Sequence, residues 1–213
     1  MKSYLKNKCA IIFGATGNIG CKLTLMLAKA DVRLIIQGRS REKLKKLDDE
    51  LKHLGKKATL IHLDVSNFQN YKRIGEIIHK RFKKIDLYFN AISEIKKLTP
   101  LTHLNHLEWD RILEINFSSK WKILKQIEFL LQKSNDPYIY FFLHKSEIKK
   151  MAYYHAYGLA NSALEKLIEV YSEEKKKFNI TIKGICKDGI IPLNNEDKNQ
   201  KSDEIKKIIK KII

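Results

Sequence analysis

The stretch that decides the fold is CAIIFGATGNIGCKLTLMLAK, Cys9–Lys29. It begins with apolar residues, passes through a glycine-rich turn and ends with the apolar spacing of a helix. Gly14, Gly17 and Gly20 follow the pattern G-x-x-G-x-x-G across that turn. Gly14 permits a tight turn, Gly17 lets a phosphate approach the backbone, and Gly20 lets the helix pack closely. The stretch predicts a phosphate-binding strand–turn–helix unit, although a glycine-rich turn could also serve packing alone.

Apolar β-branched segments alternate with helical periodicity along the rest of the chain. Near-continuous apolar strands separated by helices are typical of a buried parallel sheet. The sequence therefore predicts an α/β fold with a doubly wound parallel sheet, Rossmann-like, in three α/β/α layers. Six strands are expected at 9–13, 32–36, 58–63, 85–89, 138–143 and 180–185, and helices at about 18–29, 40–54, 70–83, 107–132 and 152–177.

No repeat or linker divides the chain, so residues 1–213 are expected to form one domain. The polar, turn-rich segment 187–200 predicts a mobile loop on the substrate side. Residues 202–213 predict an amphipathic helix, with isoleucines on one face and lysines opposite. Docking of that helix on the body is favoured over attachment to a membrane surface.

The formal net charge of +18 raises the possibility of a nucleic-acid-binding protein. Only six of the 42 basic residues are arginines, and the lysines are spread over every predicted helix. Because nucleic-acid sites favour arginine, the charge predicts a solvated surface without a specific nucleic-acid site. The three cysteines lack metal-ligand spacing, and no apolar run approaches the roughly 20 residues that span a bilayer. A soluble cytoplasmic protein without a metal is expected.

The end of the second predicted strand bears on which dinucleotide the chain binds. Asp or Glu there would bind the ribose hydroxyls of NAD, whereas this chain has Gly38 and Arg39. Arginine can contact the 2′-phosphate of NADP, so NADP(H) is favoured over NAD(H); the alternative is a solvated basic start to a helix. After the third strand, Asp64 could accept a hydrogen bond from the adenine amino group or cap a helix.

Several motifs in order resemble the short-chain dehydrogenase/reductase family over residues 8–192. FGATGNIG (13–20) is similar to the family's nucleotide loop, LDV (63–65) to its adenine-site motif and DLYFNAIS (86–93) to its N-N-A-G segment. The resemblance implies a doubly wound sheet and hydride transfer between NADP(H) and a carbonyl or alcohol substrate. It also implies the cofactor-binding residues Gly14, Thr16, Gly17, Asn18, Ile19, Gly20, Arg39, Asp64, Val65, Asn90 and Ala91.

The same resemblance implies the catalytic positions. LEWDRILEINFSSKW (107–121) is similar to the helix with the family's asparagine, here Asn116, and AYGLANSALEKL (156–167) to the helix with Y-x-x-x-K. Tyr157 matches the proton donor, and Asn161 stands where the family has lysine. His144 matches the position of the family's serine, with Ser146 two residues beyond as an alternative.

An amide at position 161 supplies no positive charge to lower the pKa of the tyrosine. The cofactor half of the site is thus expected to be intact and the substrate half impaired or rewired, with Lys145, Lys149 or Lys150 as replacement cations. The alternative is a catalytically silent dinucleotide-binding or scaffolding protein. Helices 107–132 and 152–177 resemble the pair through which the family forms dimers or tetramers.

Overall fold

The computed structural model describes residues 4–144, 152–186, 189–190 and 203–212. Its sheet has the strand order β3-β2-β1-β4-β5-β6-β7. The first six strands run parallel, and the short β7 pairs antiparallel with β6. The strands are β1 Cys9–Phe13, β2 Arg33–Gly38, β3 Ala58–His62, β4 Leu87–Asn90, β5 Tyr138–Phe142, β6 Thr181–Cys186 and β7 Gly189–Ile190. The prediction of a doubly wound parallel sheet is confirmed.

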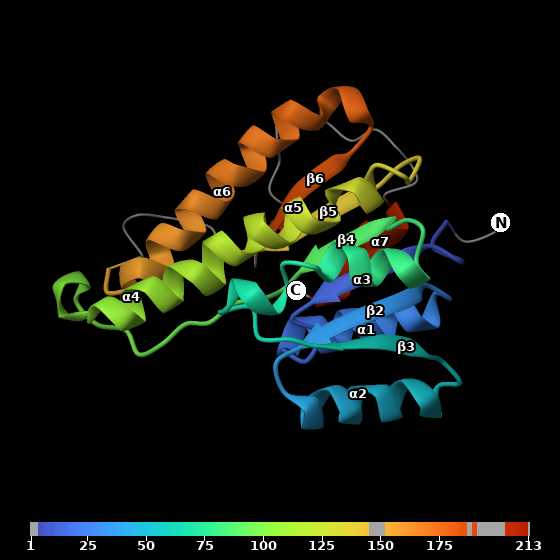
Figure 1. The fold of residues 1–213 in the computed structure, drawn as a ribbon, viewed down its shortest axis with the longest axis horizontal. Helices are drawn as coiled ribbons and strands as arrows, with labels where there is room; N and C mark the ends of the chain where they lie inside the picture. The colour runs from blue at the N-terminus through green and yellow to red at the C-terminus, as the bar shows by residue number, and fades with distance from the viewer. Residues whose placement is uncertain (1–3, 145–151, 187–188, 191–202, 213) are drawn as a thin grey trace.

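Helices follow the strands in the alternating order that the sequence predicts (Figure 1). They are α1 Asn18–Lys29, α2 Arg41–His53, α3 Ile74–Arg81, α4 His106–Leu113, α5 Ser119–Leu131, α6 His155–Lys175 and α7 Asp203–Ile212. A π-helical turn, Glu114–Ser118, joins α4 to α5. The first strand of the second half, β4, lies beside β1, so the direction in which successive strands are added across the sheet reverses between these two strands.

Alternate residues of each central strand supply the two hydrophobic cores. Cys9, Ile11 and Phe13 pack with apolar residues of α3, α5 and α6, whereas Ala10 and Ile12 pack with those of α1 and α2. Because side chains alternate across a strand, each helical layer covers one face of the sheet. Ile209 of α7 is buried in the core on the α1 side. Figure 1 shows the resulting three layers.

Two predicted helices begin later than expected. The helix expected from residue 70 begins at Ile74, because residues 68–70 form a 3-10 turn capped by Asn67. The helix expected from residue 152 begins at His155, because Tyr153 has a left-handed φ of 68°. Tyr157 nevertheless keeps the position in that helix that the sequence predicts.

The C-terminal segment differs in part from the expected loop. Gly189 and Ile190, inside the range 187–200, form β7 by pairing with Cys186 and Ile185 of β6. The remainder of that range lies outside the described residues. The α7 helix occupies most of the range in which an amphipathic helix was expected. Within the described part of the chain, no helix combines the length and the apolarity that crossing a bilayer requires.

Candidate functional site

The glycine turn between β1 and α1 is built by close packing. Gly14 has a φ of +78°, and a Cβ there would lie 2.9 Å from the backbone of Ala91. A Cβ on Gly20 would lie 2.1 Å from the carbonyl oxygen of Gly14. Around Gly17, the N-cap of α1, the nearest atom to a Cβ would be 3.4 Å away, and no side chain caps the helix. The N-terminus of α1 can therefore receive an anion such as a pyrophosphate, as the fold implies.

Gln37 is a buried residue that supports the glycine turn and that the sequence analysis missed. Its Oε1 accepts a hydrogen bond from the Gly14 N–H at 2.9 Å, and its Nε2 donates to the Leu63 carbonyl at 2.6 Å. The side chain thus joins β2 to the turns after β1 and β3. A lone amide inside the apolar segment VRLIIQG was the signal in the sequence.

A cavity of about 230 Å³, here named the adenine-side cavity, lies beyond the carboxyl ends of β1, β2 and β3. Most of the predicted cofactor residues line it, together with Lys43 and Glu94. The predicted ones are Gly14, Thr16, Gly17, Arg39, Asp64, Val65 and Ala91. Of the polar side chains that line this cavity, the sequence singled out Thr16, Arg39 and Asp64 but missed Gln37, Ser93 and Glu94.

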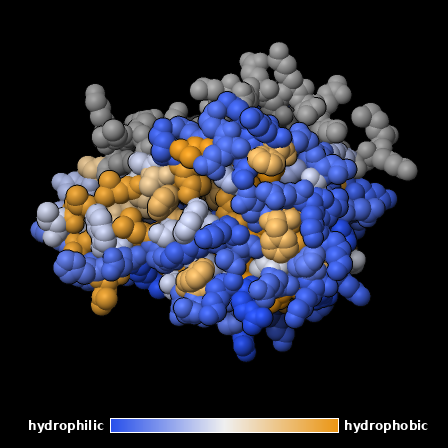
Figure 2. All heavy atoms as spheres, turned by 45° about the horizontal axis from the view of Figure 1, so that its top comes forward, coloured by the Kyte–Doolittle hydropathy of each residue, from blue (hydrophilic) through white to orange (hydrophobic). Residues whose placement is uncertain are grey.

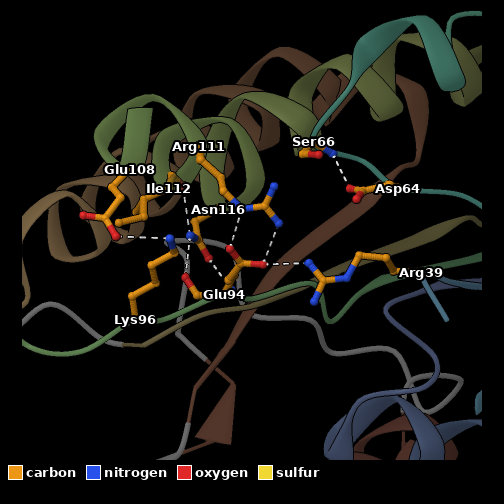
Figure 3. Close-up of polar contacts among 9 residues, drawn as sticks. All are labelled: Arg39, Asp64, Ser66, Glu94, Lys96, Glu108, Arg111, Ile112 and Asn116. Atoms are coloured by element: carbon orange, nitrogen blue, oxygen red, sulfur yellow. Dashed lines mark hydrogen bonds and ion pairs between the residues drawn. The ribbon is translucent and has the colours of Figure 1, made fainter. Parts of the chain in front are cut away.

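The side chain of Asp64 closes a turn by hydrogen-bonding the backbone two residues later. Its Oδ1 accepts a hydrogen bond from the Ser66 N–H at 2.9 Å (Figure 3). Burial raises the pKa of the carboxyl, but the Ser66 hydrogen bonds and the charges of Arg111 and Arg39 outweigh burial, so the pKa lies below its ordinary value. The helix-capping alternative is wrong, because Asn67 caps the following 3-10 turn. Asp64 stays available at the cavity wall.

Glu94 accepts hydrogen bonds from two arginines that lie in different parts of the fold (Figure 3). Arg111 of α4 donates through Nε to Oε1 at 2.8 Å and through Nη2 to Oε2 at 3.1 Å. Arg39, just after β2, donates through Nη1 to Oε2 at 2.8 Å. The Arg111 hydrogen bond is the main cause that holds the pKa of Glu94 below its ordinary range, so the carboxylate is charged at neutral pH.

Asn116 lies in the π-helical turn and holds the backbone of Glu94 from both sides. Its Oδ1 accepts from the Glu94 N–H at 3.0 Å, and its Nδ2 donates to the carbonyl oxygens of Glu94 and Ile112, each at 2.9 Å. The side chain is buried and is not among the residues that line either cavity. Its visible role is to fix the loop after β4. π-helical turns are frequent at functional sites, and this one orients Asn116.

A second cavity of about 360 Å³, here named the tyrosine-side cavity, adjoins the first. Asn18 and Ile19 from the glycine turn line it, as do Lys22, Ala91, Ser93, Phe142, Leu143, His144, Tyr157, Ile185 and Cys186. Ala91 and Ser93 line both cavities, which therefore adjoin each other along the loop after β4. A ligand seated on the glycine turn could extend to Tyr157.

The Tyr157 hydroxyl has two hydrogen-bonding neighbours. Ser93 Oγ lies 3.1 Å from Tyr157 Oη, and His144 Nδ1 also hydrogen-bonds that oxygen. Burial raises the pKa of Tyr157, and the hydrogen bonds of Ser93 and Asn161 offset that effect only in part. The tyrosine is therefore protonated at neutral pH. Of the neighbouring tyrosines, Tyr154 packs against its ring with centroids 6.3 Å apart and does not line the cavity.

Asn161, the residue in place of the expected lysine, hydrogen-bonds backbone groups inside the protein. Its Oδ1 accepts from the His144 N–H at 2.9 Å, and its Nδ2 donates to the Tyr157 carbonyl at 2.9 Å. It is buried and is not among the residues lining the tyrosine-side cavity. Asn161 therefore joins the end of β5 to α6 and holds His144 beside Tyr157.

Lys120 of α5 is a buried lysine that the sequence analysis did not single out. Its Nζ donates to the Ile92 carbonyl at 2.5 Å and to Asn90 Oδ1 at 3.4 Å. Burial lowers its pKa to about 7. Asn90 is itself buried and also accepts from the Ile92 N–H, so it supports the loop and does not line either cavity. The sequence signal was a lysine one helical turn after Asn116, on a buried face.

Four residues that the sequence raised as alternatives, Lys145, Ser146, Lys149 and Lys150, lie outside the described residues. Among the residues described, no group of three or more His, Cys, Asp or Glu side chains is arranged to hold a metal ion. The site of this structure therefore consists of the glycine turn, the two adjoining cavities and the Tyr157 hydroxyl.

Comparison with known proteins identifies the family. The sequence matches the short chain dehydrogenase family over residues 8–203. The chain belongs to that family. An uncharacterised oxidoreductase of Listeria monocytogenes is 28% identical over 187 residues, which are 85% of this chain and 73% of that protein. Membership supports dehydrogenase or reductase activity.

Solved structures show the same fold. A putative short chain dehydrogenase from Pseudomonas syringae superposes with a TM-score of 0.82 at 23% identity, covering 87% of this chain and 78% of that one. One from Shigella flexneri, complexed with NADP, gives a TM-score of 0.81 at 19% identity, covering 87% of this chain and 79% of that one. The resemblance stated from the motifs is thus confirmed at the level of family and fold.

Proposed function

We propose that this chain is an NADP(H)-linked oxidoreductase that interconverts a carbonyl and an alcohol, with a rearranged set of proton-transfer residues. The observation that carries the proposal is the Tyr157 hydroxyl, held by Ser93 and His144 in a cavity that Asn18 and Ile19 of the glycine turn also line. A bound nicotinamide would supply or accept the hydride. The protein's own residues must then deliver a proton to the substrate oxygen or remove one.

In this proposal Tyr157 is the proton donor for reduction. Ser93 and His144 orient its hydroxyl, and the proton is exchanged through the His144 Nδ1 that hydrogen-bonds it. In this proposal Ser93 and His144 support proton transfer by Tyr157, the role that the family resemblance assigns to a lysine at position 161. Since Asn161 holds the His144 backbone, its part is to position the imidazole.

The preference for NADP(H) over NAD(H) rests on charge at the adenine-side cavity. Arg39 and Lys43 both line that cavity where β2 ends. A 2′-phosphate there would gain a charge-assisted hydrogen bond from the guanidinium. The Shigella flexneri structure complexed with NADP supports the view that this fold accommodates the cofactor.

The test is NADPH consumption by the purified protein across a panel of aldehydes and ketones. Tyr157→Phe is expected to lower the rate by roughly 10²–10⁴-fold, the usual contribution of a positioned proton donor. His144→Gln is expected to lower it as well. Tyr154→Phe is the matched control and should leave the rate within about threefold of the parent, since Tyr154 makes only ring contact with Tyr157.

The second candidate is a catalytically silent dinucleotide-binding or scaffolding protein. It is favoured by Asn161 and by the raised pKa of Tyr157, because no described cation contacts the phenol. It predicts NADPH binding without turnover, and no effect of Tyr157→Phe. In that case Asn161→Lys combined with His144→Ser is expected to create activity. Turnover by the unmodified protein would exclude this candidate.

A further inference from the structure

The contact between Arg39 and Glu94 crosses the place where the proposed cofactor would lie. Arg39 follows β2 and Glu94 lies just beyond β4, and these strands are the two neighbours of β1. The glycine turn follows β1, so a contact between the two outer loops passes over that turn. Both residues line the adenine-side cavity, and Figure 3 shows the arginine reaching across to the carboxylate.

Glu94 is the fixed partner in this contact. Arg111 holds its carboxylate with two hydrogen bonds, and Asn116 holds its backbone N–H and carbonyl. The side chain of Glu94 is 20% exposed, whereas that of Arg39 is 60% exposed. Arg39 makes one hydrogen bond to Glu94, so its guanidinium is the group that can change partner.

We propose that Glu94 sets the dinucleotide selectivity of this protein by competing with the 2′-phosphate of NADP(H) for Arg39. The inference rests on the proposed function and adds a residue that weakens the expected preference. When a 2′-phosphate takes Arg39, Glu94 keeps its two hydrogen bonds from Arg111, so no carboxylate is left without a cation. NAD(H) has no 2′-phosphate and does not compete for Arg39. The ion pair therefore lowers the affinity for NADP(H) selectively.

The experiment measures dissociation constants for NADPH and NADH by fluorescence titration of the full chain. Glu94→Gln keeps a hydrogen-bond acceptor for Arg111 and removes the charge that holds Arg39. It is expected to lower the dissociation constant of NADPH about two- to fivefold relative to that of NADH, the range for a partly exposed ion pair. Glu94→Asp should act in the same direction, because its shorter side chain keeps the charge near Arg111 and withdraws it from Arg39.

Two further variants separate this effect from general electrostatics. Glu76→Gln makes the same change in net charge at an exposed pair with Arg73, and neither residue lines the cavity. It should leave the ratio of the NADPH and NADH dissociation constants unchanged. Arg39→Gln should weaken NADPH selectively, and adding Glu94→Gln to it should then have no selective effect. Thermal unfolding of each variant establishes that the fold is retained.

The outcomes separate the inference from the function on which it rests. Suppose that the parent binds NADPH but both Glu94 variants leave the ratio of the NADPH and NADH dissociation constants unchanged, even if both constants fall. The competition by Glu94 is then refuted and the proposed function stands. If the parent binds neither dinucleotide, the proposed function and the inference fail together. A selective gain for NADPH that disappears in the Arg39→Gln background supports the inference.

Discussion

The Tyr157 hydroxyl is the residue-scale feature on which the chemistry depends. Ser93 and His144 reach it from the loops after β4 and β5, and neither stands at the position where the family resemblance places lysine. Asn161 bonds backbone atoms on both sides of the site instead. The loss of the lysine is therefore accompanied by a change in which residues contact the phenol, and His144 becomes the group to test.

Lys120 allows a residue-scale prediction about stability and pH. Burial lowers its pKa from 10.5 to about 7, so between these values the unfolded chain binds the proton that the folded protein releases. Folding stability therefore falls as pH drops from about 10 to about 7, and the penalty is complete below that range. Lys120→Met is expected to raise the melting temperature by several degrees at about pH 6 and by much less at about pH 10.

The measurement is thermal unfolding followed by circular dichroism across that pH range. Lys125→Met, an exposed lysine on the same helix, is the matched control and should show no pH-dependent difference from the parent. Methionine also loses the hydrogen bond to the Ile92 carbonyl, so the pH dependence decides the question. A difference between Lys120→Met and the parent that stays constant with pH would contradict the prediction.

At the scale of elements, the continuous helical segment α4–α5 fixes the loop after β4. The π-helical turn within it turns Asn116 toward Glu94, and one turn later Lys120 holds Ile92. Both contacts act on backbone groups of a loop that lines the two cavities. The same helix therefore positions Ser93 and Glu94, which serve opposite halves of the site.

The packing of α3 on α5 gives an element-scale prediction. A Cβ on Gly75 would lie 1.8 Å from the Gln126 carbonyl oxygen, which belongs to the backbone of α5 and cannot turn away. Gly75→Ala is expected to destabilise the protein by about 2–3 kcal/mol, because α3 must move off the core. Helix propensity alone predicts the opposite sign, a gain of about 1 kcal/mol. Urea unfolding of the variant tells the two apart, and a stabilised variant would contradict the packing argument.

At the scale of the whole molecule, the surface combines many lysines with apolar side chains over α4, α5 and α6. Leu107 is 82% exposed, and Trp121, Leu159 and Val170 are about half exposed. Figure 2 shows apolar residues gathered at the end of the molecule where α4 and the start of α6 lie. A groove of about 270 Å³ between α5 and α6 is lined by Trp121 and Val170.

Two expectations about the whole molecule stay predictions of the sequence. They are that the protein does not bind nucleic acid specifically and that it is cytoplasmic.

We propose that a second copy of the chain covers α5 and α6, in a homodimer or tetramer. Trp121→Glu combined with Val170→Glu is expected to convert the assembly to monomers, because charges would be buried at the contact. Ile77→Glu is the control, at a side chain that is 61% exposed on α3. Analytical ultracentrifugation measures the mass. A parent protein that sediments as a monomer at micromolar concentration would refute the proposal.

The sequence by itself determined the order of the six parallel strands and their helices, and the glycine turn, but not the short antiparallel β7. These features are local: apolar periodicity fixes which faces are buried, and the spacing of Gly14, Gly17 and Gly20 fits one kind of turn. Arg39 and Asp64 follow from their places at strand ends, whereas His144 and Tyr157 follow from the resemblance to the family. The start of α6 did not follow, because the backbone at Tyr153 is left-handed without a glycine to signal it.

Only the tertiary structure decided which side chains meet in the site. Arg39 and Glu94 are 55 residues apart, and Lys120 lies 28 residues from the carbonyl that it contacts. Such contacts depend on the order of strands across the sheet and on the direction of each helix, which no local pattern records. The same reason explains why the sequence showed that Asn161 lacks a positive charge but not which groups its amide contacts. Its amide hydrogen-bonds the His144 N–H and the Tyr157 carbonyl, two backbone groups that only the fold brings together.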